Sequence, residues 1–244
     1  MAVEAVKGLG RLRNAAFIRL FVDLLSLAVL QLSTGLMGTV QLSDEVSIGE
    51  AAGVLATVAG ILLFGLFLIV ASIAAWVISI LGWGNICRAK WRKFYCVTRV
   101  VVILAPILAA LTVAAMVVSA FLELFATGLR GEFTGSDVFT SGFLKAFVAG
   151  LVIAAAGRIF EGVATFDLGL LTQVYLLAAA AVVYIASTAI NVASISVTWL
   201  SVVSLILSIL ANLLFGIGYH YARKRLMSQI WQPIPSPVQP TQGG

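Results

Sequence analysis

Residues 168–219 read LGLLTQVYLLAAAAVVYIASTAINVASISVTWLSVVSLILSILANLLFGIGY and contain no Asp, Glu, Lys or Arg in 52 positions. A helix rises about 1.5 Å per residue, so this stretch would reach about 78 Å as a single helix. The hydrocarbon core of a bilayer is only about 30 Å thick. Because the stretch is too long for one crossing, we predict two transmembrane helices, at about 168–190 and 194–219, joined by a tight turn.

The composition of the whole chain agrees with this interpretation. Of its 244 residues, 61% are hydrophobic and 10% are charged, and the mean hydropathy is +1.11. A soluble domain contains about 25% charged residues. We therefore predict an all-α fold, a polytopic transmembrane helix bundle that leaves no room for a sizeable soluble domain.

Hydropathy places the bundle in residues 15–222 and divides it into six helices. The other four are predicted at about 15–40, 51–82, 100–127 and 143–162. The segment 143–162 has the weakest signal, because its uncharged centre would span only about 18 Å. It crosses a bilayer only if Lys145 and Arg158 extend toward opposite surfaces. Pro106 lies in an apolar segment and predicts a kink in the third helix.

The two ends of the chain have different compositions from the bundle. Residues 1–14 place apolar and charged side chains on opposite helical faces, which predicts a basic amphipathic helix lying on the membrane surface. Arg19 and Asp23 interrupt the apolar stretch that follows, so we expect an uncleaved helix rather than a signal peptide. Residues 223–244 comprise a basic start and a tail rich in Pro and Gln, which we expect to be disordered.

The distribution of cations predicts the orientation. With the N-terminus in the cytoplasm and six crossings, 13 of the 15 Lys and Arg residues fall on the cytoplasmic side. Only Arg130 and Lys145 fall outside. Because cytoplasmic loops carry an excess of Lys and Arg, we predict a cell-membrane protein with both termini cytoplasmic. The net charge of +5 follows from the same bias and from attraction to anionic lipid.

Residues 83–99 are predicted to form a loop that mixes aromatic residues with cations. The cations are Arg88, Lys90, Arg92, Lys93 and Arg99. Such a loop contacts anionic lipid, which is the interpretation we favour, or binds a polyanion through its phosphates and bases. Cys87 and Cys96 in this loop match neither a disulfide framework nor a metal site, so we expect reduced thiols.

Ionisable residues inside apolar segments are the best pointers to function in a membrane protein. The candidates are Arg19, Asp23, Glu123, Lys145, Arg158 and Glu161. Arg19 and Asp23 are four residues apart and are predicted to form an ion pair, as are Arg158 and Glu161, which are three apart. The remaining two lie near the outer ends of neighbouring helices and can also pair. The alternatives are side chains that reach the membrane surface, and a proton or sodium pathway.

The last predicted helix carries a row of small polar side chains on one face, spaced three or four residues apart. The row comprises Ser194, Thr198, Ser201, Ser204, Ser208 and Asn212. One interpretation is packing, with Ser and Asn hydrogen-bonded to a neighbouring helix. The other is the wall of a hydrated path, with contributions from Gln31, Gln173 and Tyr184. We favour packing.

The residue inventory argues against an enzyme. The single histidine, His220, cannot supply a haem with two histidine ligands or a metal site with several histidines. The chain contains no HExxH motif and no phosphate-binding loop of the form GxxxxGK[ST]. No pairing of a nucleophile with a base is evident. We therefore expect no catalytic residues, no bound metal and no cofactor.

The opening sequence VEAVKGLGRLRNAAFIRLF, residues 3–21, precedes a six-helix layout and a tail of prolines and glutamines. In these features the chain resembles uncharacterised archaeal multi-pass membrane proteins. The resemblance implies a membrane location but no activity, and it transfers no site residues.

Taken together, these patterns predict a non-enzymatic integral membrane protein, either a transport or channel subunit or the membrane component of a translocation assembly. One alternative is a structural scaffold that conducts nothing. Another is a channel for DNA or another polymer, driven by a separate ATPase. The predicted partners are membrane lipid and, through the small-residue stripes, further copies of the chain or other membrane proteins. Nucleic acid is a partner only under the polymer-channel alternative.

Overall fold

The computed structural model describes residues 2–39, 48–129, 135–194 and 199–230. This part of the chain forms six helices and contains no strand. The helices are α1 (Ala2–Thr39), α2 (Ile48–Arg88), α3 (Lys93–Leu129), α4 (Gly135–Leu171), α5 (Tyr175–Ala193) and α6 (Trp199–Ile230). The prediction of an all-α chain with six helices is therefore confirmed.

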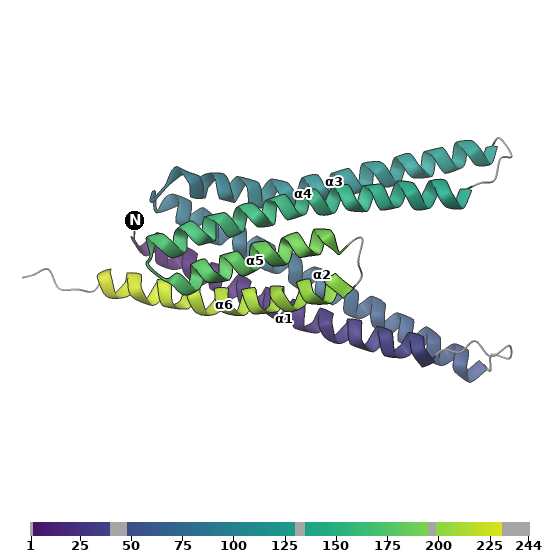
Figure 1. The fold of residues 1–244 in the computed structure, drawn as a ribbon, viewed down its shortest axis with the longest axis horizontal. Coiled ribbons are helices and arrows are strands. Elements are labelled where there is room, and N and C mark those ends of the chain that lie inside the picture. The colour runs from purple at the N-terminus through teal and green to yellow at the C-terminus, as the bar shows by residue number, and fades with distance from the viewer. Residues whose placement is uncertain (1, 40–47, 130–134, 195–198, 231–244) are drawn as a thin grey trace, which may run out of the picture.

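The six helices close into a ring of antiparallel neighbours. Each helix packs against the next one along the chain, and α6 packs back against α1. The start of α1, the end of α6 and the turns α2–α3 and α4–α5 therefore lie at one end of the molecule (Figure 1). We call this the basic end, because its cations are Lys7, Arg11, Arg13, Arg88, Lys90, Arg92, Lys93, Arg99, Arg223, Lys224 and Arg225.

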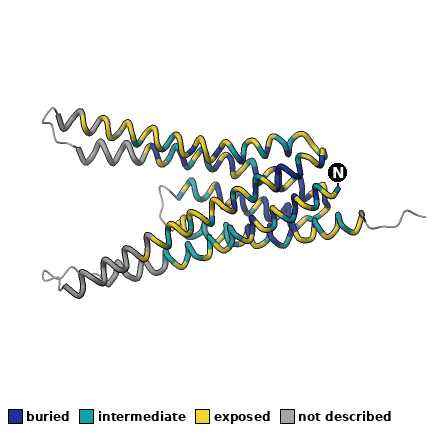
Figure 2. Tube along the Cα trace, turned by 180° about the vertical axis from the view of Figure 1, so that it is seen from behind, coloured by how far each residue is buried: buried dark blue, intermediate teal, exposed yellow. Residues whose placement is uncertain are grey.

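Away from the basic end, the two long hairpins α1–α2 and α3–α4 diverge, and the shorter pair α5–α6 lies between them (Figure 1). Buried residues are concentrated in the half of the bundle near the basic end (Figure 2). The largest fully buried side chains there include Trp83, Tyr95 and Ile86. Further from this core, large apolar side chains are exposed, such as Leu63 and Phe125, each 70% exposed. Apolar surface of this kind faces lipid in a membrane protein.

Within the described residues, five helices contain a segment that is long and apolar enough to cross a bilayer. The segments are Leu63–Arg88, Lys93–Ser119, Lys145–Leu171, Tyr175–Ala193 and Trp199–Gln229. The chain is thus a multi-pass integral membrane protein. The α4 segment has 27 residues and would reach about 40 Å, so by length and composition it can cross a bilayer despite its short uncharged centre. The described part of α1, with Arg19 and Asp23, is not among these segments.

Several predicted helix boundaries were wrong, because charged residues, or the aromatic residues next to them, had been taken as helix ends. Residues 2–14 are the first turns of α1 rather than a separate segment, and their apolar face packs into the core through Leu9 and Leu12. The α2–α3 loop is much shorter than the predicted 83–99, because α2 continues to Arg88 and α3 begins at Lys93. The helix predicted at 143–162 continues to Leu171. As a result, α5 begins at Tyr175 rather than at 168.

Close helix contacts depend on two glycines near the basic end. A Cβ atom built on Gly8 of α1 would lie 2.9 Å from the carbonyl oxygen of Gly82 on α2. One built on Gly169 of α4 would lie 2.7 Å from the backbone nitrogen of Ala178 on α5. Real Cβ atoms do not approach other atoms this closely. The absence of side chains at these positions therefore permits α1 to contact α2, and α4 to contact α5, at close range.

Candidate functional site

Four side chains from α1, α2 and α4 form a polar cluster inside the ring, which we call the ion-pair cluster: Arg19, Ser79, Trp83 and Glu161. The guanidinium of Arg19 donates two hydrogen bonds to the carboxylate of Glu161, of 3.1 Å to Oε2 and 3.3 Å to Oε1. Oε1 also accepts hydrogen bonds from the hydroxyl of Ser79, at 2.7 Å, and from the indole of Trp83, at 3.3 Å. The carboxylate of Glu161 is thus neutralised and held by four donors.

The ion-pair cluster is nearly closed to solvent. The side chain of Glu161 is 9% exposed and that of Arg19 is 24% exposed. Next to the pair is a cavity of about 10 Å³, whose lining also includes Thr165 and Tyr219. The hydroxyl groups of Thr165 and Tyr219 lie 3.0 Å apart and share a hydrogen bond. A cavity of this size admits one water molecule at most. The space beside Arg19 and Glu161 therefore holds no continuous column of water.

A second polar group, the Asp23 cluster, joins α1 to α6 and consists of Asp23, Ser208 and Asn212. The Ser208 hydroxyl and the Asn212 amide both donate to Oδ2 of Asp23, at 2.7 and 2.8 Å. Asn212 is 2% exposed, and its Oδ1 atom has no hydrogen-bond partner among the described residues. Asp23 lies four residues after Arg19, so the two clusters are one helical turn apart along α1.

Both clusters lie deeper than the sequence suggested. Glu161 is ten residues from the end of α4, or about 15 Å along the helix axis. Asn212 is 13 residues from the start of α6 and 18 from its end. Glu161 lies this far inside because α4 continues to Leu171, whereas the predicted helix ended at 162.

The predicted ion pairs within a helix are replaced by contacts between helices. Arg19 pairs with Glu161 rather than with Asp23, and Asp23 contacts α6. Arg158, the predicted partner of Glu161, is exposed, as is Lys145. The side chain of Glu123 lies outside the described residues. A two-pronged contact between Arg19 and Glu161 satisfies two guanidinium donors at once, which explains why it prevails over a single contact along one helix.

The polar row on α6 is divided between two neighbouring helices. Ser204 and Ser187 of α5 each donate a hydrogen bond to the other's backbone carbonyl, at 3.0 and 2.9 Å, which is a packing contact. Ser208 and Asn212 face Asp23 of α1. Ser194 donates to the carbonyl of Asn191 in the last turn of α5. Ser201 is exposed, and Thr198 lies outside the described residues.

The residues named as contributors to a hydrated path are also dispersed. Tyr184 belongs to the buried core, with its ring against Phe215. Gln173 lies at the α4–α5 turn of the basic end, with a positive φ of 55°. The side chain of Gln31 lies outside the described residues. Within the described part of the chain, Tyr184 and Gln173 therefore lie apart from each other, one in the core and one at the α4–α5 turn.

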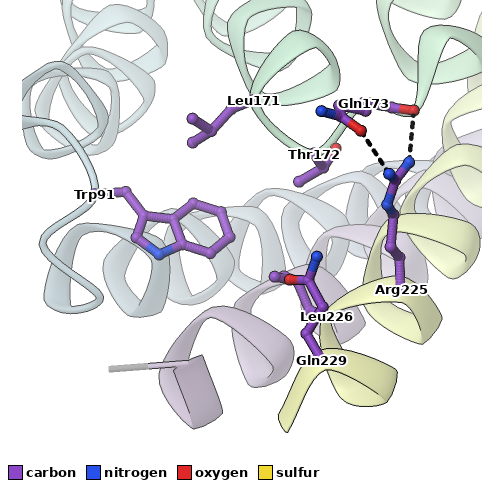
Figure 3. A pocket seen from close by; sticks show the side chains of 7 residues that line it. All are labelled: Trp91, Leu171, Thr172, Gln173, Arg225, Leu226 and Gln229. Atoms are coloured by element: carbon purple, nitrogen blue, oxygen red, sulfur yellow. Dashed lines mark hydrogen bonds between the residues drawn. The ribbon is translucent and has the colours of Figure 1, made fainter. Parts of the chain in front are cut away.

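A surface pocket of about 310 Å³ opens at the basic end (Figure 3). Its lining residues are Trp91, Leu171, Thr172, Gln173, Arg225, Leu226 and Gln229. Arg225 and Gln173 point toward one another across it, and the guanidinium donates to the backbone carbonyl of Gln173, at 3.1 Å, and to its Oε1, at 2.5 Å (Figure 3). These bonds tie the end of α6 to the α4–α5 turn.

The cations of the predicted basic loop occupy different environments. Arg92 forms an ion pair with Asp167 of α4, at 2.6 Å, and the hydroxyl of Tyr95 donates to the same carboxylate, at 2.8 Å. Arg88, Lys90 and Lys93 are exposed. Arg99 is half-buried, with its guanidinium above Gly84. Three of the five cations are therefore exposed at the basic end and carry no ion pair within the described chain.

Cys87 and Cys96 are joined by a disulfide that links the end of α2 to the start of α3. The prediction of two reduced thiols was wrong. The sequence was read as a long loop, whereas the chain forms a helical hairpin with a short turn. The hairpin brings two cysteines that are nine residues apart to a Cα–Cα distance of 4.7 Å.

Three functional candidates were missed entirely: Ser79, Trp83 and Asp167. Ser79 and Trp83 are four residues apart and thus share one face of α2. This spacing was the one feature of the sequence that could have indicated a shared partner. Asp167 was taken as the boundary between two helices. Their partners belong to other helices, so no pattern along the chain identifies the contacts.

Comparison of the chain with protein-family models, with curated proteins and with solved structures gives no match. The resemblance to archaeal membrane proteins therefore stays a prediction. The candidate site depends on its own geometry, a buried ion pair and a neighbouring carboxylate in the interior of a membrane bundle.

Proposed function

We propose that the protein is a non-enzymatic membrane transport subunit whose interior charges take part in ion movement. The observation that supports this proposal is the Arg19–Glu161 pair, buried among four helices of the ring. Ionisable side chains at membrane depth are costly, and where they occur they commonly mark ion or substrate pathways.

Stability alone is a weak explanation for such a pair. Apolar residues of similar volume in place of a buried ion pair often leave a protein equally stable or make it more stable. A second carboxylate, Asp23, lies one turn further along α1 and is partly exposed. Glu161 of α4, held by Arg19, and Asp23, one turn of α1 beyond Arg19, form the kind of arrangement through which an ion can pass in steps.

A structural scaffold is the second candidate. The reciprocal Ser187–Ser204 bonds and the small size of the interior cavity favour it, because both describe a tightly packed bundle. The polymer channel receives less support, because the described part of a single chain contains no wide lumen and an oligomer would have to supply one.

We also propose that the basic end is cytoplasmic, with both termini on that side. The exposed cations Arg88, Lys90 and Lys93 would then face the anionic lipid of the inner leaflet. In the proposed arrangement the two long hairpins diverge toward the outside.

Charge movement in reconstituted vesicles tests the transport proposal. Purified protein in liposomes is adsorbed to a sensor electrode, and currents are recorded after jumps in the concentrations of H⁺, Na⁺, K⁺ and Cl⁻ separately. We expect a current with at least one ion in the wild type. Glu161→Gln should abolish it, because Arg19 then faces a neutral amide.

The matched control is Asp167→Asn, which changes another arginine-paired carboxylate of α4, but at the basic end. It should retain the current. Absence of current with every ion in the wild type would favour the scaffold. An equal loss in both variants would contradict the assignment of the current to the Arg19–Glu161 pair.

A further inference from the structure

We infer that the Asp23 cluster is a proton-binding site, with Asp23 as the group that gains and loses the proton and Ser208 and Asn212 as its hydrogen-bonding partners. The inference names the ion for the proposed transport function and rests on that function for its biological role. The binding itself is a property of three side chains and is tested separately.

The first observation is the environment of the carboxylate. Two donors, the Ser208 hydroxyl and the Asn212 amide, converge on one oxygen, Oδ2. Among the described residues Asp23 has no salt bridge, whereas Glu161 is paired with Arg19. Asp23 is therefore a carboxylate in an interior position without a fixed counter-ion. A bound proton supplies the missing positive charge.

The second observation is the unpartnered Oδ1 atom of Asn212, on a side chain that is 2% exposed. A carboxamide carries a donor on one side and an acceptor on the other. In the present orientation the donor faces Asp23, which suits the ionised carboxylate. Rotation of the amide by half a turn would place Oδ1 there to accept a hydrogen bond from the protonated acid. Asn212 can thus serve both states.

Ser208 has the same ability, because a hydroxyl both donates and accepts. Binding is a simple protonation: one proton from water joins the carboxylate of Asp23, forming an O–H bond and removing one negative charge. Neither an electron transfer nor a co-reactant is involved. The new O–H group then donates to one of the two partners, Oδ1 of Asn212 or the oxygen of Ser208, while the other partner can continue to donate to the carboxyl group.

The geometry favours a proton over Na⁺. Hard cations bind through several oxygen atoms. At this cluster the carboxylate oxygen is approached by an N–H group and an O–H group, which are donors. Even with both side chains rotated, Ser208 and Asn212 would offer a sodium ion only one oxygen each besides the carboxylate of Asp23, which is few for a hard cation.

The charged and titratable groups that act on Asp23 come from three helices. They are Arg19 of α1, Arg158 of α4 and Tyr184 of α5. Arg19 is engaged by Glu161, and Arg158 is exposed. These two cations favour loss of the proton electrostatically, but neither forms a contact that would exclude the proton from Asp23.

Infrared difference spectroscopy on the full chain in lipid nanodiscs tests the inference. The protein is titrated from alkaline to acid pH, and the C=O stretching band of protonated carboxylic acids is followed. We expect a band that grows on acidification, shifts in D₂O and disappears in Asp23→Asn. Glu161→Gln should retain it, because the proton is assigned to the other cluster.

A second variant covers the case in which Asp23→Asn does not fold. Asn212→Leu removes the amide, so protonated Asp23 loses a hydrogen bond and its C=O band should move to higher frequency. Ser204→Ala, on the same helix but facing Ser187, should leave the band in place.

Three results would overturn the inference: no titrating band in the wild type, an unchanged band in Asp23→Asn, or a titration that NaCl displaces and choline chloride does not. The last would assign the site to Na⁺. A titrating Asp23 in a protein that moves no ions would support the proton site and contradict the transport proposal.

Discussion

The indole N–H of Trp76 on α2 donates a 2.7 Å hydrogen bond to the backbone carbonyl of Val102 on α3. Val102 lies four residues before Pro106, the proline inside α3. A proline has no backbone N–H, so the carbonyl four residues earlier loses its helical partner. In lipid, an unsatisfied carbonyl is costly, and a neighbouring helix can satisfy it. Trp76 therefore supplies to α3 the donor that Pro106 lacks.

This relationship predicts a coupling between two substitutions. Trp76→Phe should destabilise the protein by about 1–3 kcal/mol, because the carbonyl of Val102 is left unpaired. In a Pro106→Ala background the alanine N–H can bond to that carbonyl, so the same change should cost about 1 kcal/mol less. Thermal or denaturant unfolding in detergent of the two single variants and the double variant measures the difference. Equal costs in both backgrounds would show that the bond is not compensatory.

Alanine substitution should have opposite effects on stability at two glycines, one at the tight α4–α5 contact and one with open space around it. Gly169→Ala should destabilise the fold by several kcal/mol, because the new methyl group would meet the backbone of Ala178 at 2.7 Å. Gly65→Ala in α2 meets nothing within 4 Å and should stabilise by about 0.5–1 kcal/mol through helix propensity. Melting temperatures of the two variants provide the comparison. A neutral Gly169→Ala would mean that the α4–α5 contact is looser than described.

The sequence was sufficient for the number of helices but not for their ends. Uncharged stretches longer than a bilayer is thick identify membrane helices directly, as 168–219 does. Charged residues were taken as boundaries, and this failed at Glu161 and Asp167, which lie inside α4. A charge is compatible with a helix interior when another helix neutralises it, and that partner is invisible along one chain.

The candidate site was likewise predicted only in part, because contacts between helices cannot be read from the sequence. Arg19, Asp23 and Glu161 were selected correctly as interior charges, since ionisable residues in apolar segments are few. Their partners were assigned by spacing within a helix, which ignores the ring that brings α1 against α6. Hydrogen bonds of Glu161 to Ser79 and of Asp23 to Asn212 depend on that ring closure.

The disulfide and the excess of Lys and Arg lead to opposite expectations for the side of the membrane on which the basic end lies. Disulfides are rare in the cytoplasm of most organisms, although intracellular proteins of hyperthermophiles contain them. If the basic end is cytoplasmic, as we propose, a membrane-impermeant reductant followed by an impermeant maleimide should label Cys87 and Cys96 only in inverted vesicles. Labelling in intact cells would place the basic end, and with it both termini, outside. Cys87→Ser with Cys96→Ser should remain unlabelled in both preparations.

Separate and joint replacement of Arg19 and Glu161 distinguishes the structural from the functional role of the ion pair. Arg19→Met alone should destabilise the protein by about 3–5 kcal/mol, because Glu161 is then a buried charge without a counter-ion. The double variant Arg19→Met with Glu161→Met should recover part of that loss, because no buried charge remains, although Ser79 and Trp83 lose their acceptor. It should nevertheless show no ion-dependent current in vesicles. A stable double variant with full current would show that the pair serves only the fold, and the transport role would then have to rest on Asp23.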